Sequence, residues 1–461
     1  MIRFLNVYYP TRTVLLLFCE ALVVSGCFLG ATYMVLREQT AFALFQPGNG
    51  IVKIAALTLV SLMLSYYFDL YEPAIVSGRM EIYFRVLLVL GFDCFILSAF
   101  LLVDPYDMAI GRNVYVYGFA MLAPALILMR RVYDWVASSR AFRERVYVLG
   151  AGDYARSTVA MISSRSDLGM EVMDWEDVQL VEPADRKKIW ISALERLSHA
   201  NPPVRRVIIA MEKKRGELPV QELLMLRFQG IIVEDDTTLR ERIYGKIQLD
   251  GLRPSNFLYS EGFRLRSSQQ FTRQVASILA AAFLLLLFLP VFPFVVLAVK
   301  LSSKGPVFFR QRRVGMGGRN FDVIKFRTMF TDAEAGGAKW ATKNDPRVTK
   351  VGMFLRKTRI DEVPQLWNVL RGDMGFVGPR PERPEFVDWL KDELPFYYLR
   401  TLIRPGLTGW AQVRYGYGAT LAETKEKLEY DLYYIKHMSL GLDLMIMFET
   451  VKTILRRRGA Q

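Results

Sequence analysis

The first part of the chain is dominated by four long runs of apolar residues. They cover residues 14–36, 51–71, 84–103 and 114–129. Apolar runs of this kind predict helices that cross the roughly 30 Å hydrocarbon core of a membrane. The first run is too long for the core of a signal peptide and lacks a small-residue cleavage site, so we expect it to be retained.

Arginines lie at both ends of this predicted bundle. Arg3 and Arg12 precede the first run. A larger group follows the fourth run and consists of Arg130, Arg131, Arg140, Arg143 and Arg145. Because Lys and Arg favour the cytoplasmic side, both ends are predicted to be cytoplasmic, as an even number of spans requires.

A fifth apolar run, at residues 275–299, differs from the other four. Pro290 and Pro293 interrupt it, and proline removes a backbone donor and clashes with the preceding turn. The pieces on either side would be about 22 and 13 Å long at 1.5 Å per residue, so neither should cross the membrane alone. Both flanks are basic, which a spanning helix should not show. We therefore expect a re-entrant helix–break–helix, with a kinked fifth span as the alternative.

Between these membrane segments, residues 145–260 have the pattern of a soluble α/β unit. Residues 146–149, 207–210 and 230–233 read as buried parallel strands, and residues 220–228 as a helix. This succession predicts a Rossmann-like fold.

The turn after the first of these strands could cradle a dinucleotide. Gly150, Gly152 and Ala155 would place a pyrophosphate at a helix N-terminus, and Asp174 would bind the ribose. However, the unit is short, and the chain has no Tyr-x-x-x-Lys pair, which a sugar-nucleotide dehydratase or epimerase would need. A structural or regulatory domain is favoured, and NAD(P) binding stays as the alternative.

Length and composition agree with a membrane protein of about three domains. The 461 residues are 52% hydrophobic and carry a net charge of +14. Residues 261–330 are rich in Lys and Arg, as expected of a segment that binds anionic lipid headgroups, and no nucleic-acid recognition motif accompanies the charge. The three cysteines and two histidines (His199 and His437) show no disulfide framework or metal-ligand spacing.

The candidate chemistry centres on the adjacent carboxylates Asp361 and Glu362, just before Pro364. On the residues alone, carboxylates at this position are ordinary helix-capping signals. A helix N-terminus also binds phosphate, and a carboxylate kept ionised there could attack phosphorus while its neighbour holds Mg²⁺. Cations that could hold a pyrophosphate are Lys325, Arg327, Arg356, Arg380, Arg383 and Arg404.

From about residue 271 to 457 the chain resembles the bacterial sugar transferases, monotopic enzymes that act on polyprenyl phosphate. The matching motifs are Gly-Pro-Val-Phe-Phe-Arg-Gln at 305–311, Lys-Phe-Arg-Thr-Met at 325–329, Asp-Pro-Arg-Val-Thr at 345–349, Asp-Glu-Val-Pro-Gln at 361–365, and the stretches 372–381 and 404–413. Four spans and a Rossmann-like domain before this region resemble the long members, which start exopolysaccharide, capsule or O-antigen synthesis.

The resemblance implies a role for several residues. Asp361 would be the nucleophile that takes a hexose-1-phosphate from a UDP-sugar and releases UMP, and Glu362 would bind Mg²⁺. Undecaprenyl phosphate would then accept the phosphosugar. Lys325, Arg356 and Arg380 match basic positions around the phosphates. Pro290 would break the re-entrant helix, although Leu289 stands where the family usually has Ser.

The resulting expectation is a chain of three domains. Residues 1–140 would form a four-helix transmembrane bundle, residues 141–260 a Rossmann-like (CoA- or NAD-binding-like) domain, and residues 261–461 a mostly α monotopic catalytic domain with its re-entrant helix at 273–300. The resemblance places the protein in the bacterial inner membrane with its soluble domains in the cytoplasm, as a homodimer that binds no nucleic acid. Two other classes stay open, an NAD(P)-dependent sugar-nucleotide enzyme and a non-catalytic scaffold. The hexose is not readable.

Overall fold

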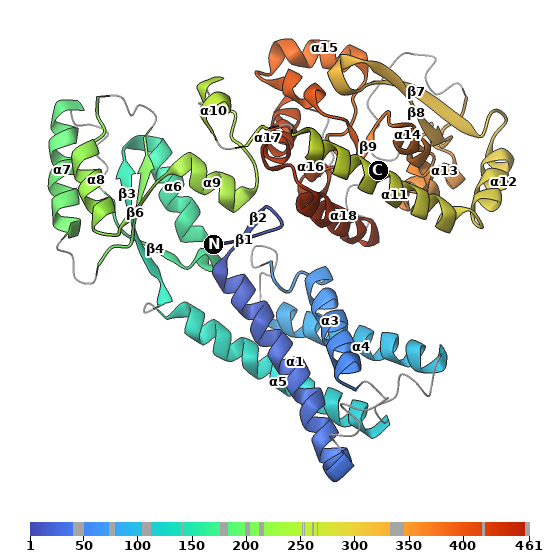
Figure 1. Ribbon diagram of the computed structural model, residues 1–461, viewed down its shortest axis with the longest axis horizontal. Helices are drawn as coiled ribbons and strands as arrows, with labels where there is room; N and C mark the ends of the chain where they lie inside the picture. The colour runs from blue at the N-terminus through green and yellow to red at the C-terminus, as the bar shows by residue number, and fades with distance from the viewer. Residues whose placement is uncertain are drawn as a thin grey trace. The chain divides into compact units, whose positions relative to one another are not determined.

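The computed structural model describes residues 1–39, 50–72, 79–103, 112–139, 142–175, 183–198, 203–211, 216–250, 252, 254–260, 262–264, 266–331, 345–416 and 420–456 (Figure 1). The chain divides into two compact units. The first holds residues 1–2 and 9–236, and the second holds residues 3–8 and 237–461. The expected domain boundaries at 140/141 and 261 fall on residues outside the described ranges.

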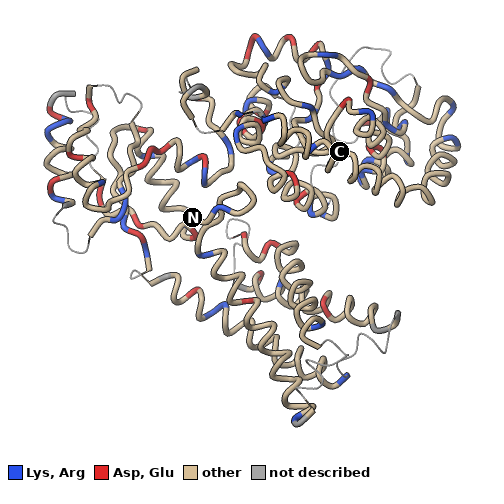
Figure 2. The backbone as a smooth tube through the Cα atoms, in the orientation of Figure 1, with Lys and Arg blue, Asp and Glu red and all other residues tan. Residues whose placement is uncertain are grey.

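Four apolar helices form a bundle in the first unit. They are α1 (Thr11–Leu36), α3 (Gly50–Tyr67), α4 (Arg79–Val103) and α5 (Arg112–Ser138), with the 3₁₀ turn η1 (Arg37–Gln39) after α1. Val24, Phe28, Leu122 and Leu126 are buried at its centre. Figure 2 shows that these helices are mostly free of charged positions. Among the described residues, five helices are long and apolar enough to cross a membrane, and four of them are these.

A few charged side chains lie inside this bundle as pairs. Arg130 Nη2 lies 2.6 Å from Glu20 Oε2, and Ser65 donates a hydrogen bond to the other oxygen of Glu20. Arg130 also donates to the carbonyl of Leu70, beyond the end of α3. A charge among apolar helices is tolerated when it is paired in this way.

A four-stranded, all-parallel sheet follows in the first unit. Its order is β4 (Met170–Asp174), β3 (Glu144–Gly150), β5 (Arg206–Ala210) and β6 (Ile232–Asp235). The helices α6 (Gly152–Ser164), α7 (Pro183–Ser198) and α8 (Val220–Phe228) and the turn η3 (Ser166–Leu168) connect the strands. Tyr147, Leu149, Trp190 and Val207 are buried in its core. The predicted α/β content with a parallel sheet is confirmed, and the predicted helix at 220–228 has those bounds.

In the second unit, the motifs that carry the candidate site residues lie on short elements around an antiparallel hairpin. The hairpin strands are β7 (Phe308–Val314) and β8 (Asn320–Phe326), and β9 (Gly375–Val377) pairs in parallel with β10 (Gly406–Thr408). The helices are α9 (Asp236–Tyr244), α10 (Pro254–Tyr259), α11 (Ser267–Phe288), α12 (Phe292–Ser302), α13 (Lys350–Lys357), α14 (Gln365–Arg371), α15 (Pro384–Glu393), α16 (Trp410–Arg414), α17 (Leu421–His437) and α18 (Leu440–Leu455). The remaining elements are β1 (Ile2–Phe4), β2 (Val7–Tyr9) and the 3₁₀ turns η4 (Met316–Gly318), η5 (Ile360–Glu362) and η6 (Tyr397–Leu402).

The fifth apolar run is broken where the prolines predicted. α11 ends at Phe288, and α12 begins at Phe292 after a turn that contains Pro290. The expected length of the first piece is wrong, because α11 begins at Ser267 and has 22 residues. At 1.5 Å per residue it is about 33 Å long, so length alone does not prevent it from crossing a membrane. The helix begins in the polar residues that precede the apolar run, so the apolar pattern alone did not reveal where it starts.

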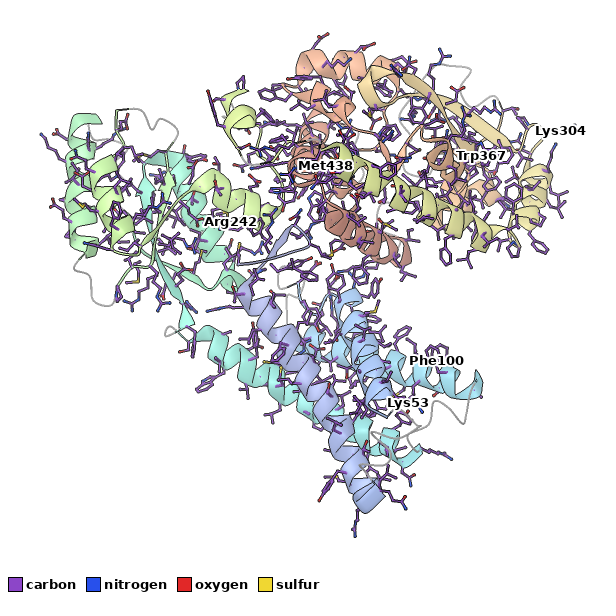
Figure 3. The ribbon with its side chains drawn as sticks, viewed as in Figure 1. Lys53, Phe100, Arg242, Lys304, Trp367 and Met438 are labelled. Atoms are coloured by element: carbon purple, nitrogen blue, oxygen red, sulfur yellow. The ribbon has the colours of Figure 1, made fainter. Side chains whose placement is uncertain are left out.

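Both ends of this helical pair pack on the second unit. Near the start of α11, Arg273 Nε lies 2.6 Å from Asp443 Oδ2 of α18, and its guanidinium also bonds the hydroxyl of Tyr434. At the other end, Val295 and Val299 of α12 are buried against core side chains of the same unit. Lys304 follows α12 at the outer edge of the unit (Figure 3).

Candidate active site

A pocket of about 500 Å³ in the second unit brings most of the candidate residues together. Its walls come from β7, β8, η5, the loop after β9, and helices α15 to α17. The predicted site residues that line it are Lys325, Arg327, Arg356, Asp361, Glu362, Arg380 and Arg383. The pocket is therefore strongly cationic, with a pair of carboxylates in its wall.

The carboxylate pair lies on η5, the short 3₁₀ turn between α13 and α14. Arg359, with φ of 58°, reverses the chain at the end of α13 so that the turn can form. The side chains of Asp361 and Glu362 are buried. The capping interpretation is wrong, because the residue that precedes α14 is Pro364 and no side chain caps that helix.

Glu362 is surrounded by cations. Its Oε1 lies 2.6 Å from Arg380 Nη2, 3.2 Å from Lys325 Nζ and 3.8 Å from Arg359 Nη1. Burial alone would raise the pKa of Glu362, but the charges of Arg380, Lys325 and Arg359 outweigh burial and hold this pKa well below its usual range. Glu362 is therefore ionised at neutral pH. All these contacts are made by Oε1.

Asp361 differs from its neighbour. Burial, and next the charge of Glu362, raise the pKa of Asp361 to about 6. Its Oδ1 is buried without a hydrogen-bond partner among the described residues. The sequence led us to expect that a helix N-terminus would keep this carboxylate ionised. That explanation is wrong, because Asp361 lies on η5 and its pKa is raised. Asp361 is still mainly ionised at pH 7, but it is weakly solvated and one of its oxygens has no partner in the described part of the chain, which are properties of a reactive nucleophile.

The other predicted cations take different positions. Arg356 Nε donates a 2.9 Å hydrogen bond to Thr328 Oγ1 in the pocket wall. Arg327 Nη2 donates to the carbonyl of Ser303 at 2.7 Å. Arg404 does not line this pocket. It lies in a separate hollow of about 40 Å³ beside Arg273 and Gln274 of α11.

Sequence reasoning missed five basic residues of the pocket, namely Arg313, Arg347, Arg359, Arg400 and Lys427. Arg313 lies two residues after Gln311 on β7, so the period of two places both side chains on the same face of the strand. Arg400 and Lys427 lie on η6 and α17, far along the chain from the carboxylates. No motif pointed to these two residues.

The residues of the possible nucleotide loop come together at the ends of β3 and β4, but each has a local role. A side chain at Gly150 would place its Cβ 2.0 Å from the carbonyl oxygen of Ala210, so this glycine permits close strand packing. Gly152 has φ of +74° and starts α6. Asp174 Oδ1 accepts from the amide of Trp175, whose indole donates to the carbonyl of Gly150. These contacts give structural reasons for all three residues.

The carboxylate pair is compatible with a magnesium site. The described residues contain no group of three or more His, Cys, Asp or Glu that could hold a metal. Mg²⁺ needs only one or two carboxylates when substrate phosphates supply its other ligands. The adjacent carboxylates of Glu362 and Asp361, whose Oδ1 has no hydrogen-bond partner among the described residues, fit this requirement. Of the histidines, His437 lies 2.8 Å from Glu241, and His199 lies outside the described residues.

Comparison with known proteins identifies the family. Residues 268–457 match the family described as bacterial sugar transferase. The chain is 45% identical over 224 residues to the UDP-N-acetylgalactosamine-undecaprenyl-phosphate N-acetylgalactosaminephosphotransferase of Aeromonas hydrophila, a match that covers 48% of this chain and 52% of that protein. The chain thus spans about half the length of that relative.

Two further relatives match a larger share of the chain. The UDP-glucose:undecaprenyl-phosphate glucose-1-phosphate transferase of Escherichia coli K12 is 33% identical over 369 residues, which are 77% of this chain and 78% of the relative. The undecaprenyl-phosphate glucose phosphotransferase of Komagataeibacter xylinus is 28% identical over 447 residues, which are 95% and 79% of the two chains. None of these relatives supports the NAD(P) alternative. The protein, a membrane enzyme, belongs to the bacterial sugar transferase family.

Proposed function

We propose that the protein transfers a hexose-1-phosphate from a UDP-sugar to undecaprenyl phosphate and thereby starts the synthesis of an exopolysaccharide, a capsule or an O-antigen. The observation that carries the proposal is the carboxylate pair in a cationic pocket. Asp361 has a buried, unpartnered oxygen, and Glu362 beside it is held by Arg380 and Lys325. The names of the relatives supply the substrate class, UDP-sugars and undecaprenyl phosphate.

In the first step, a carboxylate oxygen of Asp361 attacks the phosphorus that carries the sugar. A bond forms between this oxygen and phosphorus, the diphosphate bridge breaks, and UMP leaves with the electron pair of the broken bond. Negative charge grows on the bridging oxygen, which nearby arginine and lysine side chains stabilise. Arg356 and Arg380 in the pocket wall are the cations proposed for this task.

In the second step, a phosphate oxygen of undecaprenyl phosphate attacks the same phosphorus. The bond between Asp361 and phosphorus breaks, and its electron pair restores the carboxylate. The product is undecaprenyl-diphospho-sugar. Because Asp361 is alternately bonded to phosphorus and free, the enzyme should follow ping-pong kinetics.

Glu362 is proposed to hold Mg²⁺ through Oε2, because its contacts with Lys325 and Arg380 are made by Oε1. Bound Mg²⁺ would neutralise charge on the diphosphate. Glu362 itself also orients Arg380 and Lys325. Replacing it by Gln should therefore both raise the Mg²⁺ concentration needed for half-maximal activity and weaken the hold on these two cations.

The proposed placement has four transmembrane spans in residues 1–140, an α/β domain in 141–260, and a catalytic domain in 261–461 on the cytoplasmic side of the inner membrane. A re-entrant path for residues 273–300 is supported by the packing of both ends of this segment on one unit, through Arg273 at one end and Val299 at the other. A spanning α11 would separate these ends across the membrane. The homodimer stays a prediction.

The test is UMP release by detergent-purified protein supplied with Mg²⁺, undecaprenyl phosphate and a panel of UDP-sugars that includes glucose, galactose and their N-acetylated forms. Asp361→Asn should abolish release while leaving the protein folded. Asp388→Asn, which changes an exposed acid on α15, is the matched control and should keep full activity. Activity in Asp361→Asn, or none from folded wild-type protein with any sugar, would overturn the proposal.

A further inference from the structure

The active-site pocket has two chemically different ends. One end is lined by apolar side chains that include Pro306, Phe308, Phe326 and Phe330. The lining that comes from α15 to α17 and the residue before α15 is mixed, with the polar groups Arg383, Gln412, Thr424 and Lys427 beside the apolar Phe386, Leu390, Ala411 and Leu428. Figure 1 shows α12 and α17 on opposite sides of this unit.

The apolar end continues into the α11–α12 break. Phe292, the first residue of α12, has its ring 6.3 Å from that of Phe308 and 5.7 Å from that of Phe326. Phe308 and Phe326 are stacked at 5.6 Å, and Phe308 is 40% exposed. Aromatic side chains therefore lead from the apolar helices into the pocket. A long hydrocarbon chain gains free energy when it is buried along such a surface.

Arg327 lies at this apolar end, directly after β8, and the residues that the structure describes give it no anionic partner. Its side chain is only 6% exposed. Nη2 donates to the carbonyl of Ser303, but Nε and Nη1 have no hydrogen-bond partner among the described residues, and no carboxylate in that part of the chain forms an ion pair with Arg327. A buried guanidinium without a counter-ion is costly. Such a cation in a pocket wall indicates that an anionic ligand completes its environment.

The position of Arg327 is fixed by the chain that leaves α12. Its amide donates to the carbonyl of Val307 at 2.9 Å. A Cβ at Gly305, whose φ is +130°, would lie 2.3 Å from Nη1, so only glycine lets the guanidinium pack here. By contrast, Lys325 and Arg380 are already paired with Glu362 on the carboxylate side of the pocket.

We propose that the lipid acceptor enters by the apolar end and that its phosphate pairs with Arg327, while the nucleotide of the donor occupies the end lined by Arg383 and Lys427. This assignment rests on the proposed function. It divides the two substrates between the ends of one pocket, with Asp361 serving both. In the second step the phosphate held by Arg327 supplies the attacking oxygen, the bond from Asp361 to phosphorus breaks, and no further reactant is needed.

The test separates the two half-reactions. The burst of UMP in the absence of acceptor measures the first step, and the KM for undecaprenyl phosphate at saturating UDP-sugar measures binding of the acceptor. In Arg327→Gln we expect an unchanged burst and donor KM, and an acceptor KM raised tenfold or more, as for loss of a hydrogen bond to a charged group. Arg327→Lys, which keeps the charge, should recover part of the acceptor affinity and guards against misfolding.

Arg310→Gln is the matched control, because Arg310 lies on β7 with its side chain exposed, outside the pocket lining. It should change neither step. A loss of the UMP burst in Arg327→Gln, or an unchanged acceptor KM, would overturn the assignment of Arg327. A burst that persists in Asp361→Asn would instead overturn the proposed function, so the two failures can be told apart.

A last arm distinguishes the acceptor from ordinary anionic lipid, which also carries a phosphate. Phosphatidylglycerol is titrated into the assay with wild type and Arg327→Gln. If Arg327 binds the acceptor, the lipid should leave the ratio of the two acceptor KM values unchanged. If phosphatidylglycerol competes with the acceptor in the wild type and not in Arg327→Gln, Arg327 is a general site for lipid headgroups and the proposal is wrong.

Discussion

The guanidinium of Arg400 donates a 3.0 Å hydrogen bond to the main-chain carbonyl of Arg380. Arg400 is itself held by Asp431 Oδ2 at 2.8 Å and by the hydroxyl of Tyr397 at 2.6 Å. Because the side chain of Arg380 pairs with Glu362, these contacts connect α17 to the carboxylate pair. Arg400 touches no reacting atom in the proposed mechanism and is a positioning residue for Arg380.

Replacing Arg400 by Lys should therefore slow the enzyme while leaving substrate binding nearly intact. A lysine cannot make the three separate contacts of the guanidinium, so Arg380 loses its fixed position. We expect kcat to fall about tenfold, which corresponds to roughly 1.4 kcal/mol in the barrier, with little change in the KM for undecaprenyl phosphate. Arg371→Lys, at an exposed position of α14, is the control. A change in the acceptor KM alone would contradict the positioning role.

The first step should lose rate in acid as Asp361 takes up a proton. Its pKa is raised to about 6, mainly by burial, so the nucleophilic form is nearly complete above pH 7. Below pH 6 the rate constant of the UMP burst should fall about tenfold per pH unit. The Arg347 hydrogen bonds lower the pKa of Asp345 to about 2, so this carboxylate does not titrate in the same window. A burst rate that is constant from pH 5 to 8 would contradict the assignment of Asp361.

The two neighbouring carboxylates should have opposite effects on stability. The pKa of Asp361 is raised in the folded state, so its ionised form is disfavoured there, and it lowers stability above pH 6. Asp361→Asn should leave the free energy of unfolding unchanged or raise it by on the order of 2 kcal/mol at pH 7.5.

The pKa of Glu362 is lowered, so its ionised form contributes stability that is present at neutral pH and lost as the carboxylate is protonated in acid. Glu362→Gln should lower stability by about 3 kcal/mol, because buried cations lose their partner. Thermal unfolding of Asp361→Asn and Glu362→Gln in detergent measures both changes in stability. Equal shifts in the same direction would contradict the difference between the two environments.

Part of this site could be predicted from sequence, because some signals are local. Pro290 ends a helix by its own chemistry, and the break lies where that residue stands. Asp361, Glu362 and the nearby Lys325 were found through motifs. Their pKa values could not be predicted, because these depend on burial and on which cation faces which oxygen.

Other features depend on contacts between distant segments. Arg400 was missed because its partners, Asp431 and the carbonyl of Arg380, lie 31 and 20 residues away. The early start of α11 was missed for a similar reason. Its polar first turns pack within the second unit, where Arg273 pairs with Asp443, 170 residues along the chain. Arg404, grouped with the phosphate-binding cations by composition, lies instead in the hollow beside α11.

The glycine at the end of β3 provides a test of the α/β domain. A Cβ at Gly150 would lie 2.0 Å from the carbonyl oxygen of Ala210 on the adjacent strand, and backbone cannot yield cheaply. Gly150→Ala should therefore destabilise this unit by about 1–3 kcal/mol through overpacking. Gly216→Ala, at a position with open space around it, controls for the loss of glycine, although its φ of +87° adds some strain of its own. If Gly150 serves only packing, NAD(P)H added to wild-type protein should not raise its unfolding temperature. A rise that Gly150→Ala abolishes would assign a nucleotide to this loop.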